Sequence, residues 1–488
     1  MQLRAKSVKL NAGRPVVILN SFMAEKFGVH TDERVVVKKN HHKIIAVVDT
    51  SASLIGRDEI AVSSEVLDAL NAKEGEELEI QNAPKPESLS YIQKKIACKT
   101  LSSSEIYEIM QDVVNNALTE AEIAYFVSAV YHCGMSIKET ADMVNALVKT
   151  GKTLGLKKSL IVDKHSIGGI AGNRITPIVV AICTALGLVM PKTSSRAITS
   201  AAGTADTMET LCRVNFSIPE LRKIVEKTNG CIVWGGAIGL APADDKLIQV
   251  ERLLNLDPEP QLLASIMAKK LAVGSKYILI DIPYGKTAKV TRTEAFSLEK
   301  KFLSLSKFFQ LKLQCKLTDG SQPIGNGIGP ILEMKDVLSV LTGLSVPDLE
   351  KKSVAIAGKL LEMCGKAEKN KGVEKARKIL ESGEAFDQFK KIINAQKGSI
   401  RKLKEARYQH EITAERSGKV KEIDNMKINQ IARIAGSPVD KSAGIYLFKH
   451  VTDKVEKGNV IMTLYAESDH RLKDAIKFYK ILKPVTIA

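Results

Sequence analysis

The sequence lacks an apolar run long enough to cross a membrane. Its longest apolar stretch, residues 178–190, is interrupted by Thr184 and lies between Pro177 and Pro191. That is well short of the roughly 20 apolar residues that a bilayer requires. The first ten residues, MQLRAKSVKL, also lack the apolar core of a secretory signal. We therefore expect a cytoplasmic protein with no membrane partner.

Cysteine is scarce and follows no pattern. The seven cysteines include no CxxC pair, so they indicate neither a zinc site nor a disulfide framework. Most of them lie in apolar surroundings, and reduced thiols agree with a cytoplasmic protein. We expect no metal and no disulfide.

Aromatic residues are also few, at 5% of the chain, although a net charge of +17 is typical of nucleic-acid-binding proteins. Residues 351–410 alone hold 16 lysines and arginines against 7 aspartates and glutamates. Apolar residues recur at helical spacing in this stretch, so its lysines most simply line solvated helix faces. The apolar positions are Ile379, Leu380, Phe386, Phe389, Ile392 and Ile393. A nucleic-acid-binding regulatory protein is one alternative, but we expect no nucleic-acid partner.

Length and patterning predict an α/β protein with several domains, in which a helical lobe faces a mixed α/β lobe across a cleft. Three segments, residues 102–117, 119–134 and 136–151, each open on Ser or Thr with an acid about three residues later, which predicts helix starts. The expected domains are a β-barrel module at residues 1–84 with one helical piece at 64–71, a helical lobe at 88–155 to which 243–272 return, an α/β phosphate-binding lobe at 156–242 and 273–405, and a β-rich C-terminal domain at 406–488.

Two polar segments predict an anion-binding site: VDKHSIGG at residues 162–169 and KTSSRAITSAAGTADT at residues 192–207. Each follows a short apolar run (160–162 and 189–190) and precedes a helix-like run, so we expect loops where strands lead into helices. Backbone N–H groups and helix N-termini bind anions at such junctions. The cation and hydroxyls that suit one oxyanion are Lys164, Ser166, Thr176, Ser194 and Thr204. Turn-forming glycines and helix-capping hydroxyls are the structural alternative.

These segments, with ASIMAKKLA at residues 264–272 and YGKTAKV at 284–290, resemble the thymidine phosphorylase superfamily. They are more similar to its archaeal-type branch, the AMP phosphorylases, over nearly the whole chain. The resemblance implies phosphorolysis of AMP, and of CMP and UMP as further substrates, to free base and ribose 1,5-bisphosphate. Inorganic phosphate would be a co-substrate, with no metal or organic cofactor, and the N-terminal module would serve assembly of a homo-oligomer, a dimer or larger.

The resemblance also assigns roles to individual residues. The phosphate ligands would be Lys164, Ser166, Thr176, Ser194 and Thr204, although matching Thr176 requires one extra residue in the spacing. The nucleotide contacts would be Gly169, Ser195, Arg196, Ala197, Ile198, Thr199, Ser200, Thr204, Ser265, Lys269 and Lys289. Lys270, which follows Lys269 on the helix, should point elsewhere. A salt bridge at the strand end is the structural alternative for Arg196.

Two residues are expected to take part in catalysis. Lys164 beside His165 favours a neutral imidazole near pH 7, and the resemblance places His165 next to the substrate. Asp257 matches the proton donor of the AMP phosphorylases. That role requires a raised pKa, because a free aspartate has a pKa of about 3.9 and is ionised at neutral pH. Alternatively, Asp257 simply caps a helix that begins near Pro258.

The base-recognition position departs from the pyrimidine phosphorylases. Their arginine, fifteen residues before the helix serine, is replaced by Val250 here, and valine cannot donate a hydrogen bond to a pyrimidine carbonyl. This favours purine recognition, with a pyrimidine nucleoside phosphorylase acting on thymidine or uridine as the alternative. A phosphoribosyltransferase is a further alternative. Such an enzyme usually needs magnesium, and no acidic pair near the two segments suits that metal.

Overall fold

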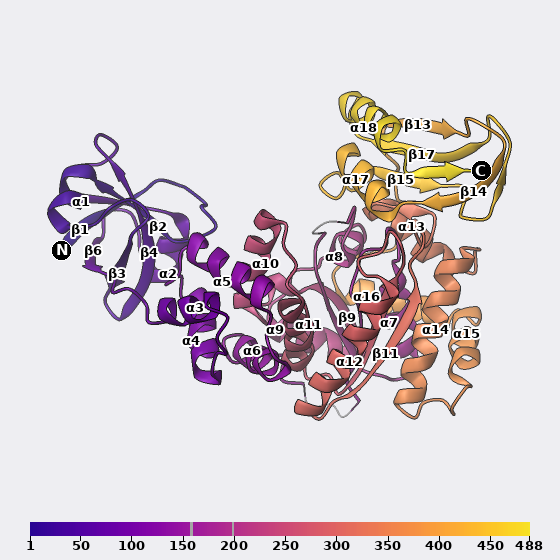
Figure 1. Ribbon diagram of the computed structural model, residues 1–488, viewed down its shortest axis with the longest axis horizontal. Coiled ribbons are helices and arrows are strands. Elements are labelled where there is room, and N and C mark those ends of the chain that lie inside the picture. The colour runs from indigo at the N-terminus through magenta and orange to yellow at the C-terminus, as the bar shows by residue number, and fades with distance from the viewer. Residues whose placement is uncertain (157–159, 198–199) are drawn as a thin grey trace. The chain divides into compact units, whose positions relative to one another are not determined.

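The computed structural model describes residues 1–156, 160–197 and 200–488, which form two compact units (Figure 1). The first comprises residues 1–151 and 241–268, and the second comprises 152–240 and 269–488. The predicted class, a multi-domain α/β protein with a barrel, a helical lobe and a β-rich C-terminal part, is confirmed. Among the described residues, no helix is long and apolar enough to cross a bilayer.

A closed six-stranded barrel forms the start of the first unit, with strand order β1-β5-β2-β4-β3-β6. Valines alternate along its strands, so that Val35 and Val37 of β3 are buried while Val36 between them is partly exposed. The sequence analysis predicted this barrel and the helical piece at 64–71, which is α2, but it missed helix α1. The elements are β1 (Gln2–Ser7), β2 (Val16–Asn20), α1 (Ser21–Phe27), β3 (Arg34–Lys39), β4 (His42–Ser51), β5 (Glu59–Val62), α2 (Ser64–Leu70) and β6 (Glu77–Asn82).

Helices make up the rest of the first unit, and three of them begin with complete capping boxes, as the Ser/Thr and acid spacing predicts. Ser102, Thr119 and Ser136 each exchange hydrogen bonds with a glutamate three residues later. The helices are α3 (Ser88–Ile96), α4 (Ser103–Val114), α5 (Glu120–Cys133), α6 (Ile137–Lys149), α10 (Pro242–Leu254) and most of α11 (Glu259–Val273).

A disulfide in the first unit contradicts the expectation of reduced cysteines. Cys98 follows α3, Cys133 ends α5, and the two are bonded with their Cα atoms 5.2 Å apart. Their separation of 35 residues carries no spacing signature, because helix packing and not local sequence brings them together. Cys183, Cys212 and Cys231 are free and buried, as expected from their apolar surroundings.

A parallel sheet organises the first half of the second unit. β11-β10-β7 form one set of parallel strands and β8-β9 another, and a parallel bridge between Ile161 and Val189 joins them in the order 11-10-7-8-9. The carboxyl ends of all five strands therefore lie along one edge. The strands are β7 (Val162–Ser166), β8 (Met190–Ser194), β9 (Gly230–Trp234), β10 (Tyr277–Tyr284) and β11 (Lys312–Asp319).

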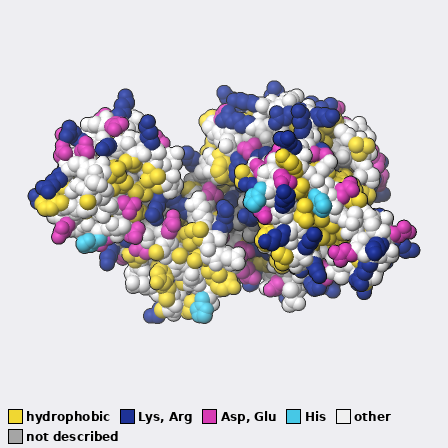
Figure 2. Space-filling model, turned by 90° about the horizontal axis from the view of Figure 1, so that it is seen from above, with side chains coloured by type: hydrophobic (Ala, Val, Ile, Leu, Met, Phe, Trp, Pro, Cys, Tyr) yellow, Lys and Arg dark blue, Asp and Glu magenta, His cyan; other side chains and the backbone are white. Residues whose placement is uncertain are grey.

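The helix after β7 is the centre of the largest apolar core. Residues 175–184 of α7 are all buried, and the helix packs against α14 and α16. The basic stretch 351–410 is mostly helical up to Ala395, as predicted, with surface pairs such as Lys378–Glu374. Figure 2 shows acidic side chains among the basic ones on the face that it presents. The helices are α7 (Ile175–Ala185), α8 (Thr204–Met208), α9 (Ile218–Thr228), η1 (Gly235–Ala237), α12 (Arg292–Phe308), α13 (Pro330–Leu341), α14 (Pro347–Met363), α15 (Gly372–Glu381) and α16 (Glu384–Ala395).

The C-terminal module, residues 408–487, is β-rich as predicted but also contains two helices that the sequence analysis did not identify. A four-stranded sheet has the order β12-β15-β17-β13, so β12 (Gly327–Ile328) of the α/β part joins the strands of this module. A three-stranded sheet has the order β16-β14-β18. The elements are β13 (Tyr408–Thr413), β14 (Gly418–Ile423), α17 (Asn425–Ala435), β15 (Gly444–Leu447), β16 (Lys454–Val455), β17 (Val460–Ala466), α18 (Asp469–Leu482) and β18 (Val485–Ile487).

We predict that Glu139→Ala destabilises the first unit. Glu139 is buried, accepts the N–H groups of Leu101 and Ser136, and lies 3.0 Å from the Lys95 ammonium. Burial opposes its ionisation, but these donors outweigh burial and lower the pKa of its carboxyl. Removing one partner of a buried pair costs about 3 to 5 kcal/mol. Urea denaturation of the full chain measures this loss.

The matched control is Lys138→Ala, because Lys138 forms an exposed pair with Asp142 on the same helix, worth about 0.3 to 0.5 kcal/mol. Because the folded-state pKa of Glu139 is depressed, its contribution is present above the carboxyl's unfolded pKa and is lost as the pH falls through the folded one. Equal denaturation midpoints for the two variants at neutral pH would contradict the prediction.

Candidate active site

The carboxyl-terminal edge of the parallel sheet brings the predicted phosphate ligands together. Lys164, His165 and Ser166 are the last three residues of β7, and Ser194 is the last residue of β8. The prediction that these residues lie in loops after strands ending at 162 and 190 was therefore wrong. Their polar character suggested a loop, but buried charge partners allow the strands to continue through them. The first loop (residues 167–174) follows β7, and the second loop, described at 195–197 and 200–203, follows β8.

Lys164 is almost completely buried, and its Nζ donates to the Thr176 hydroxyl at 3.2 Å. Thr176 lies in the first turn of α7. Burial, reinforced by the nearby Lys352 and Arg174 cations and opposed by Asp281, lowers the pKa of Lys164 to about 7. The ammonium therefore lacks a carboxylate of its own and is poised for an anion.

Buried lysines outnumber carboxylates at this edge. Asp163 lies 2.7 Å from Lys270 and 3.3 Å from Lys192, so a single carboxylate serves two ammonium groups. The remaining carboxylate, Asp281, lies 3.0 Å from Lys352 and also attracts Lys164. Four lysines thus share two aspartates, and the excess positive charge suits an anionic ligand.

The Ser166 hydroxyl supplies an independent sign of a ligand. Its Oγ is buried and has no hydrogen-bond partner among the described residues, as is also the case for Thr193 Oγ1 and Asn173 Oδ1. A buried unpaired hydroxyl costs about 1 to 3 kcal/mol, so such groups are rare without a functional reason. Ser166 pairs in register with Asp281 on β10, the aspartate that lies 3.0 Å from Lys352.

Arg174 is a site residue that the sequence analysis missed. It lies at the N-terminus of α7, and its guanidinium donates to the Thr204 hydroxyl at 2.6 Å, to the Ala202 carbonyl at 2.8 Å and to Glu333 at 2.7 Å. Thr204 is thereby tied to the end of the first loop. A cation at a helix N-terminus opposes the helix dipole, and this unusual placement was a signal available in the sequence.

Arg196 forms the salt bridge that the sequence analysis gave as its structural alternative, and its contact with the nucleotide stays a prediction. Its guanidinium donates to Asp206 at 2.9 Å and to Glu209 at 2.7 and 2.8 Å, and it lies 4.9 Å from the Trp234 ring centre. The Asp206 carboxylate also accepts the N–H groups of Ala197 and Gly203, so this cluster shapes the second loop.

Three serines that were predicted as ligands lie in the second loop or directly before it. Ser195 is exposed, the Ser200 hydroxyl donates to the Ala202 carbonyl at 3.0 Å, and the Ser194 hydroxyl donates to the Val233 carbonyl at 3.0 Å. The predicted contacts Ile198 and Thr199 lie outside the described residues.

Gly169 brings Lys289 next to the first loop. Gly169 has a φ of +88°, and a Cβ atom there would lie 2.7 Å from the backbone nitrogen of Lys289. Only glycine combines this left-handed conformation with so close an approach. The segment that carries Lys289 is therefore held against the loop that follows Ser166.

His165 is surrounded by cations. Burial, followed by the charges of Lys270, Lys192 and Lys164, lowers the pKa of its imidazole well below the usual value. The ring is therefore neutral at pH 7, as the sequence analysis expected, and it can donate one hydrogen bond and accept another.

The remaining predicted residues lie on α10, α11 and the turn between them. Asp257 is exposed in that turn, and the Ser265 hydroxyl donates to Asp244 at 2.9 Å. Val250 is buried in α10. Lys269 is half-buried on α11, next to Lys270, whose ammonium contacts Asp163 as described above. The substrate contacts of Lys269 and Ser265 and the proton-donor role of Asp257 stay predictions.

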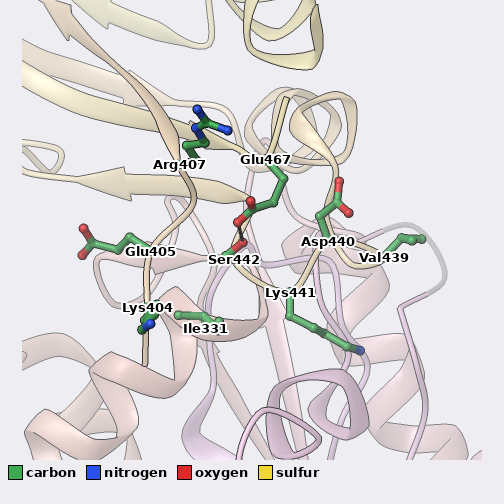
Figure 3. Close-up of a pocket in the computed structure, with 9 residues that line it drawn as sticks. All are labelled: Ile331, Lys404, Glu405, Arg407, Val439, Asp440, Lys441, Ser442 and Glu467. Atoms are coloured by element: carbon green, nitrogen blue, oxygen red, sulfur yellow. Dashed lines mark hydrogen bonds between the residues drawn. The ribbon is translucent and has the colours of Figure 1, made fainter. Parts of the chain in front are cut away.

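A separate hollow of about 550 Å³ opens beside the C-terminal module (Figure 3). Lys441, which lines it, also reaches Glu209 at 2.8 Å and so connects this surface to the Arg196 cluster. The other lining residues are Ile331, Lys404, Glu405, Arg407, Val439, Asp440, Ser442 and Glu467. The mixture of acids and bases here differs from the lysine-rich edge of the sheet. Within the described chain, no group of three or more His, Cys, Asp or Glu is arranged to hold a metal ion.

Three family models match consecutive parts of the chain. Residues 89–151 match the helical bundle domain of a glycosyl transferase family, residues 158–386 match its a/b domain, and residues 419–484 match the pyrimidine nucleoside phosphorylase C-terminal domain. An anthranilate phosphoribosyltransferase structure from Thermus thermophilus superposes with a TM-score of 0.54 at 17% identity, covering 63% of this chain and 99% of that one. That likeness shows the fold alone.

Curated relatives match almost end to end. The AMP phosphorylase of Methanocaldococcus jannaschii is 45% identical over 97% of this chain and 95% of its own length, and that of Methanococcus vannielii is 39% identical over 99% and 97%. A putative thymidine phosphorylase of Legionella pneumophila is 45% identical over 93% of this chain and 88% of its own. The chain therefore belongs to the pyrimidine nucleoside phosphorylase family, in the branch that includes the AMP phosphorylases.

Proposed function

We propose that this protein is a nucleotide phosphorylase that converts AMP and inorganic phosphate to adenine and ribose 1,5-bisphosphate. A phosphate oxygen forms a bond to C1′ of the ribose while the C1′–N9 bond breaks and its electron pair moves into the purine. A proton delivered to the purine ring completes the release of adenine. CMP and UMP are further substrates in this proposal.

The observation that carries the phosphate site is the unpaired Ser166 hydroxyl at a sheet edge where four lysines share two aspartates. An inorganic phosphate at this place would accept from Ser166 and Lys164 and would neutralise the excess charge. Desolvated cations hold a nucleophilic anion in position. The anion in turn stabilises the positive charge that develops on the ribose, so the cations act on that charge only through the anion. Two threonines complete this set of phosphate ligands. Lys164 donates to the Thr176 hydroxyl, and Arg174 donates to the Thr204 hydroxyl.

The choice of AMP is supported by two observations. Relatives named AMP phosphorylases match nearly the whole chain, and Val250 occupies the position where the pyrimidine enzymes carry an arginine. A purine does not need that donor, whereas a pyrimidine site without it would lose much of its discrimination. Lys269 and Lys289 supply cations for the 5′-phosphate, and His165 contributes a neutral imidazole next to the sugar.

The proposal includes three conditions for the reaction. Phosphate is a co-substrate and no metal or organic cofactor takes part. The location is the cytoplasm, because charged nucleotides cross membranes poorly. The protein acts as a homo-oligomer, and large apolar side chains exposed on the first unit support self-association, among them Tyr125, Tyr131 and Leu253.

We predict that the purified protein releases base from AMP in the presence of phosphate and does so far more slowly from adenosine, uridine or thymidine. The 5′-phosphate supplies binding energy that the nucleosides lack. Chromatography of free base, with phosphorus NMR of the sugar product, measures the reaction. A preference for adenosine or for a pyrimidine nucleoside would overturn the assignment.

Asp257→Asn should lower kcat for AMP by about 10²- to 10⁴-fold, the range typical of a general acid. The defect should be much smaller for 4-nitrophenyl ribose 5-phosphate, whose leaving group needs no proton. Glu259→Gln, two residues away at the start of α11, is the matched control and should retain activity with both substrates. Equal defects of Asp257→Asn with both substrates would exclude proton donation.

The affinity for phosphate should fall at alkaline pH. Lys164 carries its charge below a pKa of about 7 and loses it as the pH rises, so binding above that pH requires proton uptake. Where inorganic phosphate is already a dianion, kcat/KM for phosphate should drop by up to about tenfold per pH unit.

Steady-state kinetics across the alkaline range tests this pH dependence. Lys164→Arg should flatten the decline, because a guanidinium stays protonated, even if the variant is slower overall. A wild-type profile with no alkaline decline would show that Lys164 does not titrate at the site.

A further inference from the structure

Helix α17 of the C-terminal module contacts both loops of the anion site. It begins at Asn425, and Asn429 follows one turn later, so the two side chains share a helix face. Asn425 Oδ1 accepts the backbone N–H of Ala171 in the first loop at 3.0 Å. Asn429 Oδ1 accepts the backbone N–H of Ala201 in the second loop, also at 3.0 Å. Both asparagines are buried.

Asn425 also reaches a third segment. Its Nδ2 donates to the Thr287 hydroxyl at 3.0 Å and to the Gly320 carbonyl at 3.1 Å. Thr287 lies two residues before Lys289, in the segment that packs against Gly169. A single buried amide therefore fixes the first loop relative to the segment that carries Lys289.

Apolar packing and an ion pair reinforce these hydrogen bonds. Ala171 and Ala201 belong to the same buried core as Ile428 and Ala432 of α17. Lys441, between α17 and β15, lies 2.8 Å from Glu209 of the Arg196 cluster. The C-terminal module thus contacts the second loop directly at Ala201 and indirectly through the carboxylates that bind Arg196.

We propose that Asn425 and Asn429 are positioning residues that hold the two loops in their anion-binding geometry, so that the C-terminal module sets the affinity of the site. The identity of the substrate rests on the proposed function, but the positioning does not. Loss of either side-chain oxygen leaves a buried N–H unpaired. The loop then occupies its binding geometry for a smaller fraction of the time, and the apparent affinity falls by that fraction.

Hydrogen exchange on the unliganded full chain tests the positioning directly. Asn429→Ala should accelerate exchange in peptides covering residues 195–203 and leave residues 167–174 unchanged, and Asn425→Ala should show the reverse pattern. Gln430→Ala is the matched control, because Gln430 is an exposed amide on the same helix. Asn429→Asp keeps an acceptor oxygen and should restore slow exchange. If Asn429→Ala exchanged like Gln430→Ala, or accelerated the whole C-terminal module equally, the proposal would be overturned.

Phosphate binding provides the second measurement. Trp234 is the only tryptophan of the chain and lies against Arg196 at the second loop, so its fluorescence can follow a titration with inorganic phosphate. Asn429→Ala should weaken binding by about 5- to 30-fold, with KM for phosphate rising more than kcat falls, and Asn429→Asp should recover most of the loss.

Unchanged phosphate affinity in Asn429→Ala, or an equal loss in Gln430→Ala, would also refute the proposal. Failure of the proposed function has a different signature: the wild-type protein would bind phosphate and show the same exchange pattern but release no adenine from AMP.

Discussion

The sharing of the Asp163 carboxylate between Lys192 and Lys270 is the interaction on which the second unit depends. It joins β7, β8 and α11, three elements that converge on the edge of the sheet where the proposed anion site lies. Burial disfavours the charged carboxylate, but the two ammonium groups outweigh it and lower the pKa of Asp163. Without this carboxylate, two uncompensated lysines would remain buried, a cost that proteins of ordinary stability do not tolerate.

The same arrangement leaves the edge electrostatically incomplete. Asp163 already serves two lysines and Asp281 pairs with Lys352, so among the described residues a threonine hydroxyl is the one direct partner of the Lys164 ammonium. The depressed pKa of Lys164 and the unpaired Ser166 hydroxyl both accompany this incomplete pairing. The fold gives up stability at this place, and the phosphate of the proposed function would recover it on binding. Sites whose groups are held ready for a charge in this way bind it with little reorganisation.

Local chemistry was the part of the structure that the sequence analysis could predict. Ser136 and Glu139 mark a helix start because both residues lie within one turn, and Lys164 and Thr176 are separated by a single loop. Asn425 and Asn429 had no such signal, since they bond to residues 254 and 228 positions away. The disulfide between Cys98 and Cys133 was not predicted for the same reason, since 35 residues separate the two cysteines. The ends of β7 and β8 were misplaced because charged residues in a strand are recognisable only once their buried partners are known.

The Arg196 cluster and the lysine-rich end of β7 differ in their balance of positive and negative charge. Arg196 resembled a nucleotide ligand in sequence, yet its guanidinium contacts Asp206 and Glu209, and Lys441 contacts the same two carboxylates. Two cations and two anions make this cluster locally neutral. Its effect on the second loop is geometric, because Asp206 also holds the N–H groups of Ala197 and Gly203. The excess positive charge therefore lies at the lysine-rich end of β7, and the Arg196 cluster orders the backbone at Ala197 and Gly203.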